Sequence, residues 1–203
     1  MTWQTWILYA VAAAGLSLTP GPNGLLALTH GALYGAKKTI ATIMGGSLGF
    51  ALIIGLSMFG IGALLATAAG WLVVLKWAGG AYLVWLGVQL IRADPIRIQA
   101  VENPKNITAS SLFSQGLFSA LSNPKGILFF VAFLPQFVGT ETSLFTQFLI
   151  MALTFVLIEF GYEIAVASMA DKIKPWLAKA GKKFNLFIGL VFVIIGVLLP
   201  LRG

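Results

Sequence analysis

The chain has 203 residues, of which 59% are hydrophobic and 9% are charged, with a mean hydropathy of +0.94 and a formal net charge of +7. This composition is typical of an integral membrane protein and excludes a water-soluble domain as the main part of the chain. Cysteine is absent and His30 is the one histidine, which excludes disulfides, thiolate metal sites and His-rich metal sites. The basic residues stand between apolar stretches, so their expected partner is the anionic lipid bilayer surface and not nucleic acid.

Six apolar stretches are each long enough to cross a bilayer as a helix, which takes about 20 residues. The N-terminus carries no side-chain cation before the first stretch, so we expect that stretch to be a retained span and not a cleaved signal. The sequence therefore predicts an all-α integral membrane protein with six transmembrane helices. In chain order the predicted spans are 6–30, 39–67, 71–91, 112–138, 144–169 and 184–201.

Basic residues follow the first, third and fifth predicted spans. Because positive residues favour the cytoplasm, these three connections are predicted to be cytoplasmic and both termini periplasmic. On the opposite side Arg202 is the one basic residue. The residues that carry this prediction are Lys37, Lys38, Arg92, Arg97, Lys105, Lys172, Lys174, Lys179, Lys182 and Lys183. The last five surround Pro175 in a stretch for which we expect a short amphipathic helix along the inner surface.

Two short sequence patterns occur once in each half of the chain. The first is Pro-Asn-Gly-Leu-Leu at 22–26 and Pro-Lys-Gly-Ile-Leu at 124–128. The second is a pair of glycines seven residues apart in the last span of each half, Gly80 and Gly87, then Gly189 and Gly196. Internal repeats of this kind are typical of transporters whose broken helices meet near the bilayer midplane.

The repeats and the charges together predict the domain organisation. We expect residues 1–95 and 111–203 to form two three-helix repeats within a single transmembrane domain, joined by a cytoplasmic linker at 96–110. Because three spans are an odd number, the second repeat is predicted to be inverted relative to the first.

The most specific local motif is Thr19-Pro20-Gly21-Pro22-Asn23, inside the first span. Its prolines lack the N–H groups that would bond carbonyl oxygens one turn upstream, so the helix is predicted to break here. Backbone groups freed by a break, together with the side chains of Thr19 and Asn23, are suited to hold the carboxylate and ammonium of an amino acid. One alternative is a simple kink that helps the span to tilt and pack. Another is that the first segment is re-entrant and does not cross the membrane.

The matching break in the fourth span is predicted at Asn123-Pro124-Lys125. Lys125 lies about 12 residues into that span, roughly 18 Å deep, where an unpaired charge is costly. Glu159 enters from the other side to a similar depth and is the expected counter-ion. Either Lys125 holds a substrate carboxylate and Glu159 holds the ammonium or a coupled proton, or the two form a static ion pair. Glu163, one turn further on, either guides substrate inward or is solvated, and we expect it to be solvated.

These motifs resemble those of the LysE/RhtB family of amino-acid exporters. The resemblance rests on Thr-Pro-Gly-Pro-Asn in the first span, a glycine-punctuated second span, Gly-Ala-Tyr-Leu at 80–83, and Asn-Pro-Lys before an aromatic run in the fourth span. It implies a secondary transporter in a bacterial inner (plasma) membrane that exports amino acids or close derivatives by antiport with an ion, expected to be a proton. We favour neutral amino acids, although no residue decides the substrate, and we expect no cofactor.

Other functions fit the sequence less well. A protease within the membrane would need a Ser–His pair, a His-Glu-x-x-His motif or two paired aspartates, and the sequence shows none of these patterns. An enzyme is therefore not expected. No sequence resembles a channel selectivity filter. An exporter of divalent metals or other small solutes is the remaining alternative, although soft metal ligands are scarce. A homodimer is one of the oligomeric states that the sequence leaves open.

Overall fold

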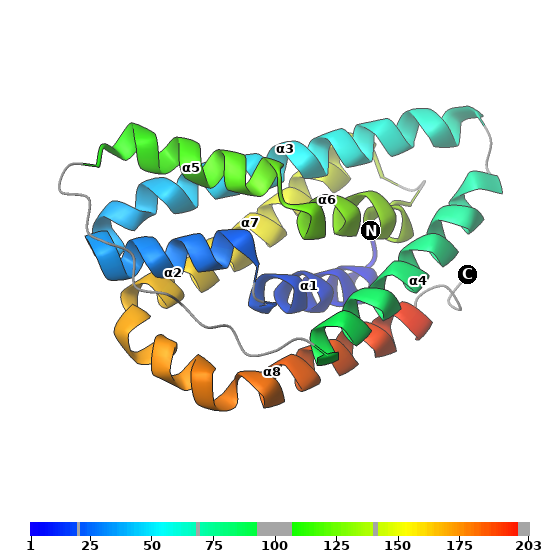
Figure 1. The fold of residues 1–203 in the computed structure, drawn as a ribbon. Coiled ribbons are helices and arrows are strands. Elements are labelled where there is room, and N and C mark those ends of the chain that lie inside the picture. The colour runs from blue at the N-terminus through cyan, green and yellow to red at the C-terminus, as the bar shows by residue number, and fades with distance from the viewer. Residues whose placement is uncertain (20, 68–69, 93–106, 140–141, 199–203) are drawn as a thin grey trace.

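The computed structural model describes residues 1–19, 21–67, 70–92, 107–139 and 142–198 of the chain. Every regular element in these ranges is a helix, as the sequence predicts (Figure 1). In chain order they are α1 (Trp3–Leu18), α2 (Pro22–Tyr34), α3 (Ala36–Thr67), α4 (Gly70–Arg92), α5 (Ala109–Leu121), α6 (Pro124–Phe133), the 3₁₀ turn η1 (Leu134–Gln136), α7 (Leu144–Ser168) and α8 (Ala170–Leu198).

The first and fourth predicted spans are each divided into two helices at a proline. α1 ends at Leu18 and α2 begins at Pro22, while α5 ends at Leu121 and α6 begins at Pro124. Proline interrupts a helix but is well accepted as the first residue of a new one, because that position needs no N–H partner. The axes of α5 and α6 meet at a bend of 51°. Both predicted breaks are therefore present.

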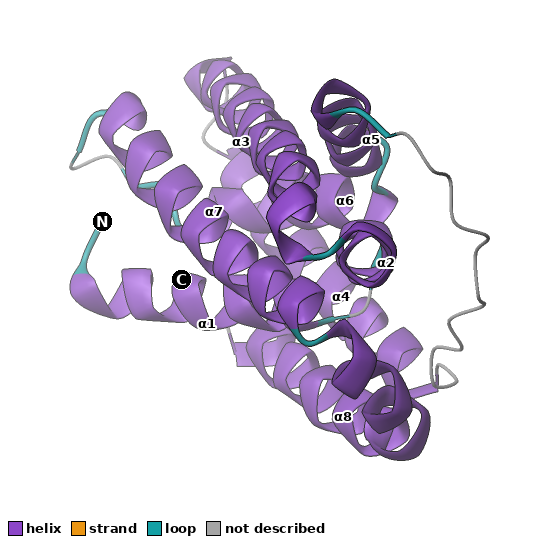
Figure 2. Ribbon diagram, turned by 90° about the vertical axis from the view of Figure 1, so that its left-hand side faces the viewer, coloured by secondary structure: helices purple, strands orange, loops and turns teal. Residues whose placement is uncertain are grey.

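The long helices α3 and α7 lie beside the broken ones. α3 packs along α5 and α7, α7 packs against α1 and α2, and α4 packs against α8. The turn from α2 to α3, the turn from α7 to α8 and the start of α5 all lie at one end of the bundle, on the left of Figure 1. The start of α1 and the end of α3 lie at the other end, and Figure 2 shows the same bundle from the side.

The repeated glycines bring α4 and α8 into close contact. A β-carbon added at Gly87 would lie 2.5 Å from the carbonyl oxygen of Gly189, and one added at Gly196 would lie 2.6 Å from that of Gly80. Real side chains do not tolerate such distances, so these positions require glycine. Small residues of this kind let membrane helices approach each other closely.

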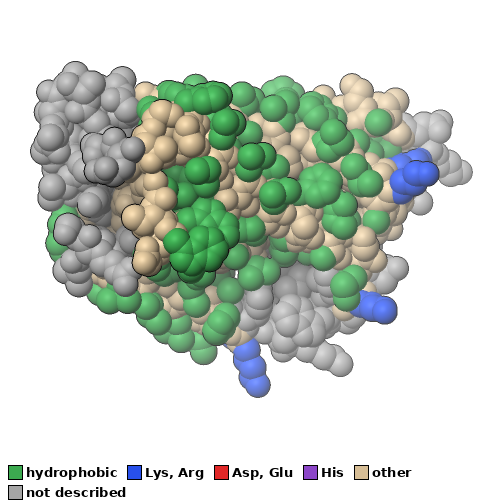
Figure 3. Space-filling model, turned by 180° about the vertical axis from the view of Figure 1, so that it is seen from behind, with side chains coloured by type: hydrophobic (Ala, Val, Ile, Leu, Met, Phe, Trp, Pro, Cys, Tyr) green, Lys and Arg blue, Asp and Glu red, His purple; other side chains and the backbone are tan. Residues whose placement is uncertain are grey.

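The outer surface of the bundle is apolar. Leu56 on α3 and Leu157 on α7 are 73% and 69% exposed, whereas Glu159 and Glu163 on α7 are buried. Figure 3 shows hydrophobic side chains spread over much of the described part of one face, with Lys or Arg side chains near its edges. Apolar groups outside and charged groups inside are what a bilayer requires of a protein that it surrounds.

In the described part of the chain, fewer helices are long and apolar enough to cross a membrane than the six that the sequence predicts. Within the described residues, Ala36–Gly60 and Leu144–Ser168 are long and apolar enough to cross a membrane, and the bent pair α5–α6 makes a third if it counts as one span. Asn185–Leu198 is a shorter apolar helix. The six-span arrangement thus stays a prediction. Pro20, Arg97, Asn103, Lys105, Arg202 and most of the expected linker lie outside the described residues.

The stretch around Pro175 is helical, as expected. It is the first part of α8, which runs from Ala170 to Leu198. Pro175 lies within the second turn of α8 and lacks the N–H that would bond to the carbonyl oxygen of Asp171, so the helix continues past one missing hydrogen bond.

Candidate functional site

The break between α1 and α2 leaves backbone carbonyl groups at the end of α1. Thr19 caps α1, and its hydroxyl donates to the carbonyl oxygen of Gly15 at 2.7 Å. In an uninterrupted helix the carbonyl oxygen of Leu16 would accept from residue 20, which is a proline and has no N–H. The negative end of the α1 dipole is therefore directed into the middle of the bundle.

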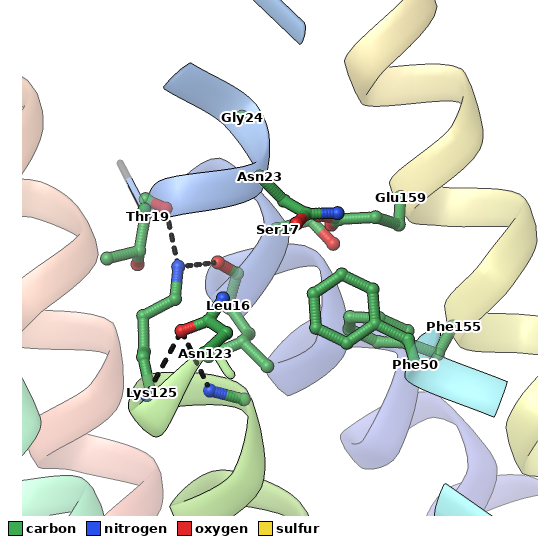
Figure 4. A pocket seen from close by; sticks show the side chains of 12 residues that line it. Leu16, Ser17, Thr19, Asn23, Gly24, Phe50, Asn123, Lys125, Phe155 and Glu159 are labelled. Atoms are coloured by element: carbon green, nitrogen blue, oxygen red, sulfur yellow. Dashed lines mark hydrogen bonds between the residues drawn. The ribbon is translucent and has the colours of Figure 1, made fainter. Parts of the chain in front are cut away.

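Lys125 at the start of α6 reaches across to this helix end. Its ammonium group donates to the carbonyl oxygen of Thr19 at 2.7 Å and to that of Leu16 at 3.1 Å (Figure 4). Gly21 makes room for it, since a β-carbon there would lie 2.7 Å from Lys125 Nζ. A lysine in the second break thus neutralises the end of the helix in the first break.

Asn123 shapes the second break. Its side-chain oxygen accepts from the backbone N–H of Lys125 at 3.1 Å and of Gly126 at 3.4 Å, as an N-cap residue does. This cap fixes the first turn of α6 and so fixes the direction in which Lys125 leaves the backbone.

A small cavity lies where the two breaks meet. It has room for about one water molecule (about 10 Å³), which is far less than an amino acid occupies. Figure 4 shows Lys125 on one side and Glu159 on the other. The lining residues are Leu16, Ser17, Thr19, Gly21, Asn23, Gly24, Phe50, Asn123, Lys125, Gly126, Phe155 and Glu159.

Aromatic rings close one side of the cavity. Phe50 from α3 packs edge-on against Phe155 from α7 at a centroid distance of 5.1 Å, and Phe130 from α6 packs against Phe155 at 4.8 Å. All three side chains are buried. The cavity is therefore polar at the helix breaks and apolar on the side of these rings.

Two carboxyl groups of α7 are buried next to the breaks. Glu159 is 5% exposed and Glu163 is 1% exposed, so the expectation that Glu163 is solvated is wrong. Residues four apart lie on one face of a helix, and here that face turns inward. Glu159 Oε2, Glu163 Oε1, Asn23 Oδ1 and Ser17 Oγ are all buried and have no hydrogen-bond partner among protein atoms.

Lys125 and Glu159 do not form a direct ion pair, which was one of the two alternatives that the sequence left open. The Lys125 ammonium interacts electrostatically with both carboxyl groups of α7, but the hydrogen bonds that it donates go to Leu16 and Thr19. The backbone carbonyls of a broken helix compete for the ammonium, and in this conformation they hold it.

Asn23 approaches Glu163 from α2. Its amide nitrogen lies so close to Gly46 of α3 that a β-carbon there would collide with it, and Glu163 Oε2 would lie 3.8 Å from the same β-carbon. Asn23 is 3% exposed. A glycine in α3 therefore makes room for the contact between α2 and α7.

The predicted site residues are mostly brought together. Thr19, Gly21, Asn23, Asn123, Lys125 and Glu159 line one cavity. Pro22 instead faces a groove between α2 and α5. Pro124 is the first residue of α6, and Pro20 lies outside the described residues.

Four features of the site were not predicted from the sequence, namely Ser17, Phe50, Phe155 and the burial of Glu163. For Ser17 a signal existed, because a hydroxyl group two residues before the proline-rich motif can reach a broken helix end. For the two phenylalanines none existed, since 15 phenylalanines occur in the chain. Among the described residues, no group of three or more His, Cys, Asp or Glu side chains is arranged to hold a metal ion.

Comparison with known proteins gives a consistent result. The family model of the LysE type translocator matches residues 14–203. A homoserine/homoserine lactone efflux protein of Salmonella typhimurium is 32% identical over 202 residues, which cover 98% of this chain and 97% of the relative. A leucine efflux protein of Enterobacter sp. is 34% identical, over 91% of this chain and 90% of the relative. An uncharacterized membrane protein of Vibrio cholerae is 33% identical, over 98% of this chain and 98% of the relative. No solved structure matches the chain.

Proposed function

We propose that this chain, which belongs to the LysE type translocator family, exports neutral amino acids or their close derivatives from the cytoplasm of a bacterium. The relatives named for leucine efflux and for homoserine efflux support this substrate class, because both names refer to small amino-acid-like molecules without a side-chain charge. The observation that carries the proposal is the polar cavity between the two helix breaks, with an ammonium group and a carboxyl group facing it inside an apolar bundle.

The cavity offers complementary groups to an amino acid. Lys125 binds the substrate carboxylate and Glu159 binds the substrate ammonium, while Asn23 and Asn123 orient the two ends. The cavity is too small for this substrate in the conformation described, so α1–α2 and α5–α6 separate before substrate enters. Separation takes the Lys125 ammonium away from Thr19, and the substrate carboxylate then replaces the backbone carbonyls as its partner.

The inverted repeat is supported by the contacts between α4 and α8. In a two-fold relation between the repeats, Gly80 corresponds to Gly189 and Gly87 corresponds to Gly196. The contact of Gly87 with Gly189 then has its symmetric counterpart in the contact of Gly196 with Gly80, and both contacts are present. In the same relation we expect the break before α2 to correspond to the break before α6. We therefore retain two three-helix repeats, 1–95 and 111–203, joined by the linker at 96–110, as the architecture that accompanies this function.

We expect both termini to be periplasmic in the inner membrane. Three of the described cations, Lys37, Lys38 and Lys172, lie near the starts of α3 and α8 at one end of the bundle, which the basic-residue rule assigns to the cytoplasm (Figure 1). Single cysteines introduced at 37 and 172 should react with an impermeant maleimide only after the cells are opened. Labelling of either position in intact cells would contradict the orientation.

Efflux from loaded proteoliposomes tests the substrate class. Vesicles that contain the purified protein and labelled leucine, homoserine, lysine or Mn²⁺ are diluted into buffer with an inward proton gradient. We expect leucine and homoserine to leave several-fold faster than from protein-free vesicles, and lysine and Mn²⁺ not to. Efflux of Mn²⁺ in place of the amino acids would favour the metal exporter instead.

A further inference from the structure

Glu163 is a buried carboxyl group that amino-acid binding does not need. It is 1% exposed, and it does not line the cavity that Glu159 and Lys125 share. One of its oxygen atoms, Oε1, has no hydrogen-bond partner among protein atoms. A buried and unsatisfied carboxylate oxygen is costly unless a proton or a cation compensates for it.

The groups that face Glu163 come from several elements. α2 contributes the Asn23 amide, α6 contributes the Lys125 ammonium, and α7 itself contributes Glu159 and Tyr162. From α3 the neighbour is Gly46, which carries no charge. His30, further along α2, is bonded to Thr42 through Nδ1 at 2.7 Å.

The charges in this cluster are unequal. One ammonium group, Lys125, acts electrostatically on two carboxyl groups, and it already donates hydrogen bonds to two backbone carbonyls. Two buried carboxylates beside one cation leave one negative charge uncompensated. Like charges so close in a low-dielectric setting rarely ionise together, and one of the two usually keeps a proton.

We propose that Glu163 is the proton-binding group that couples amino-acid export to the proton gradient. This inference rests on the proposed function, and it assigns the coupling proton to a residue other than the substrate-binding Glu159. Glu163 lies four residues closer than Glu159 to the end of α7 at Ser168, which is the cytoplasmic end in the proposed orientation.

The coupling follows from the burial of Glu163 between α2, α3 and α7. While the carboxyl group of Glu163 carries its proton, Glu163 is neutral. The charge of Glu159 is then balanced by that of Lys125, and the closed arrangement of α2, α3 and α7 buries no uncompensated charge. When the O–H bond breaks, its electron pair stays on the carboxylate and the proton passes to water on the cytoplasmic side. The carboxylate then favours hydration and separates α2 from α7, which opens the cavity to cytoplasmic substrate. A proton from the periplasm restores the neutral acid after the substrate has left.

Infrared spectroscopy tests the protonation directly and needs no transport. A protonated carboxylic acid has a carbonyl stretch that an ionised carboxylate lacks. We expect the purified protein at neutral pH to show this band, Glu163→Gln to lose it and Glu163→Asp to keep it at a shifted position. A band that survives in Glu163→Gln and disappears in Glu159→Gln would overturn the assignment, as would its absence from the wild type.

Proteoliposomes test the coupling. In a one-proton exchange the steady-state concentration ratio of substrate changes about tenfold per pH unit across the membrane, because each unit is worth 1.36 kcal/mol. We expect this dependence in the wild type, and loss of it in Glu163→Gln, whose substrate ratio should be the same with and without the gradient. A Glu163→Gln protein that still follows the gradient as the wild type does would overturn the inference. A wild type that moves no amino acid would instead refute the proposed function, while the infrared band would still decide where the proton lies.

Discussion

Replacement of Lys125 by methionine is expected to reduce amino-acid efflux at least tenfold. The ammonium group donates to the carbonyl oxygens of Leu16 and Thr19 in the closed conformation, and in our proposal it binds the substrate carboxylate in the open one. A hydrogen bond from a charged donor contributes about 1.5–3 kcal/mol, and 1.4 kcal/mol is a factor of ten, so even one lost bond gives this effect. The measurement is the initial rate of leucine efflux per molecule of inserted protein.

Two controls separate the site from a general effect of charge. Lys37→Met removes an exposed lysine at the start of α3 and should leave efflux unchanged. The double variant Lys125→Met with Glu159→Gln removes both charges of the supposed ion pair. Because Lys125 bonds to backbone carbonyls and not to Glu159, the double variant should stay inactive. Recovery of efflux in the double variant would mean that the two charges are structural partners and that substrate binds elsewhere.

The helix breaks were predictable because their cause is local. A proline removes its own N–H wherever it stands, so Pro22 and Pro124 mark the start of a new helix without reference to the rest of the fold. The repeated glycines were informative for a similar reason. Residues seven apart lie on one face of a helix, so Gly80 and Gly87 share a face of α4. A face without side chains is needed where another helix packs closely, as α8 does here.

The partners of the charged groups were not predictable in the same way. Depth along a helix indicated that Lys125 and Glu159 are buried, but whether a side chain bonds to a carboxylate or to a freed carbonyl depends on how the two breaks are placed in three dimensions. The burial of Glu163 was missed because α7 is apolar on nearly every side, so its sequence does not show which face turns inward. The length of α8 was not predicted, because sequence patterns locate helix boundaries poorly.

Replacement of Gly46 by alanine is expected to disturb the site without removing any of its polar groups. The added β-carbon would collide with the amide nitrogen of Asn23 and would approach Glu163 Oε2 at 3.8 Å. Overpacking of this kind costs about 1–3 kcal/mol, which corresponds to a loss of about 5- to 150-fold if it displaces Asn23 from a substrate-binding position. We expect a lower unfolding temperature in detergent and a loss of efflux in that range.

Gly161 of α7 provides the matched control, because it is also a helical glycine but a β-carbon there would meet no atom within 4 Å. Gly161→Ala should therefore keep both stability and efflux. Combining Gly46→Ala with Asn23→Ala removes the colliding amide, so the unfolding temperature should recover. Efflux should not recover, because in our proposal Asn23 orients the substrate and is now absent. If efflux returned together with stability, Asn23 would be a packing residue, and the substrate would depend on Lys125 and Asn123 without it.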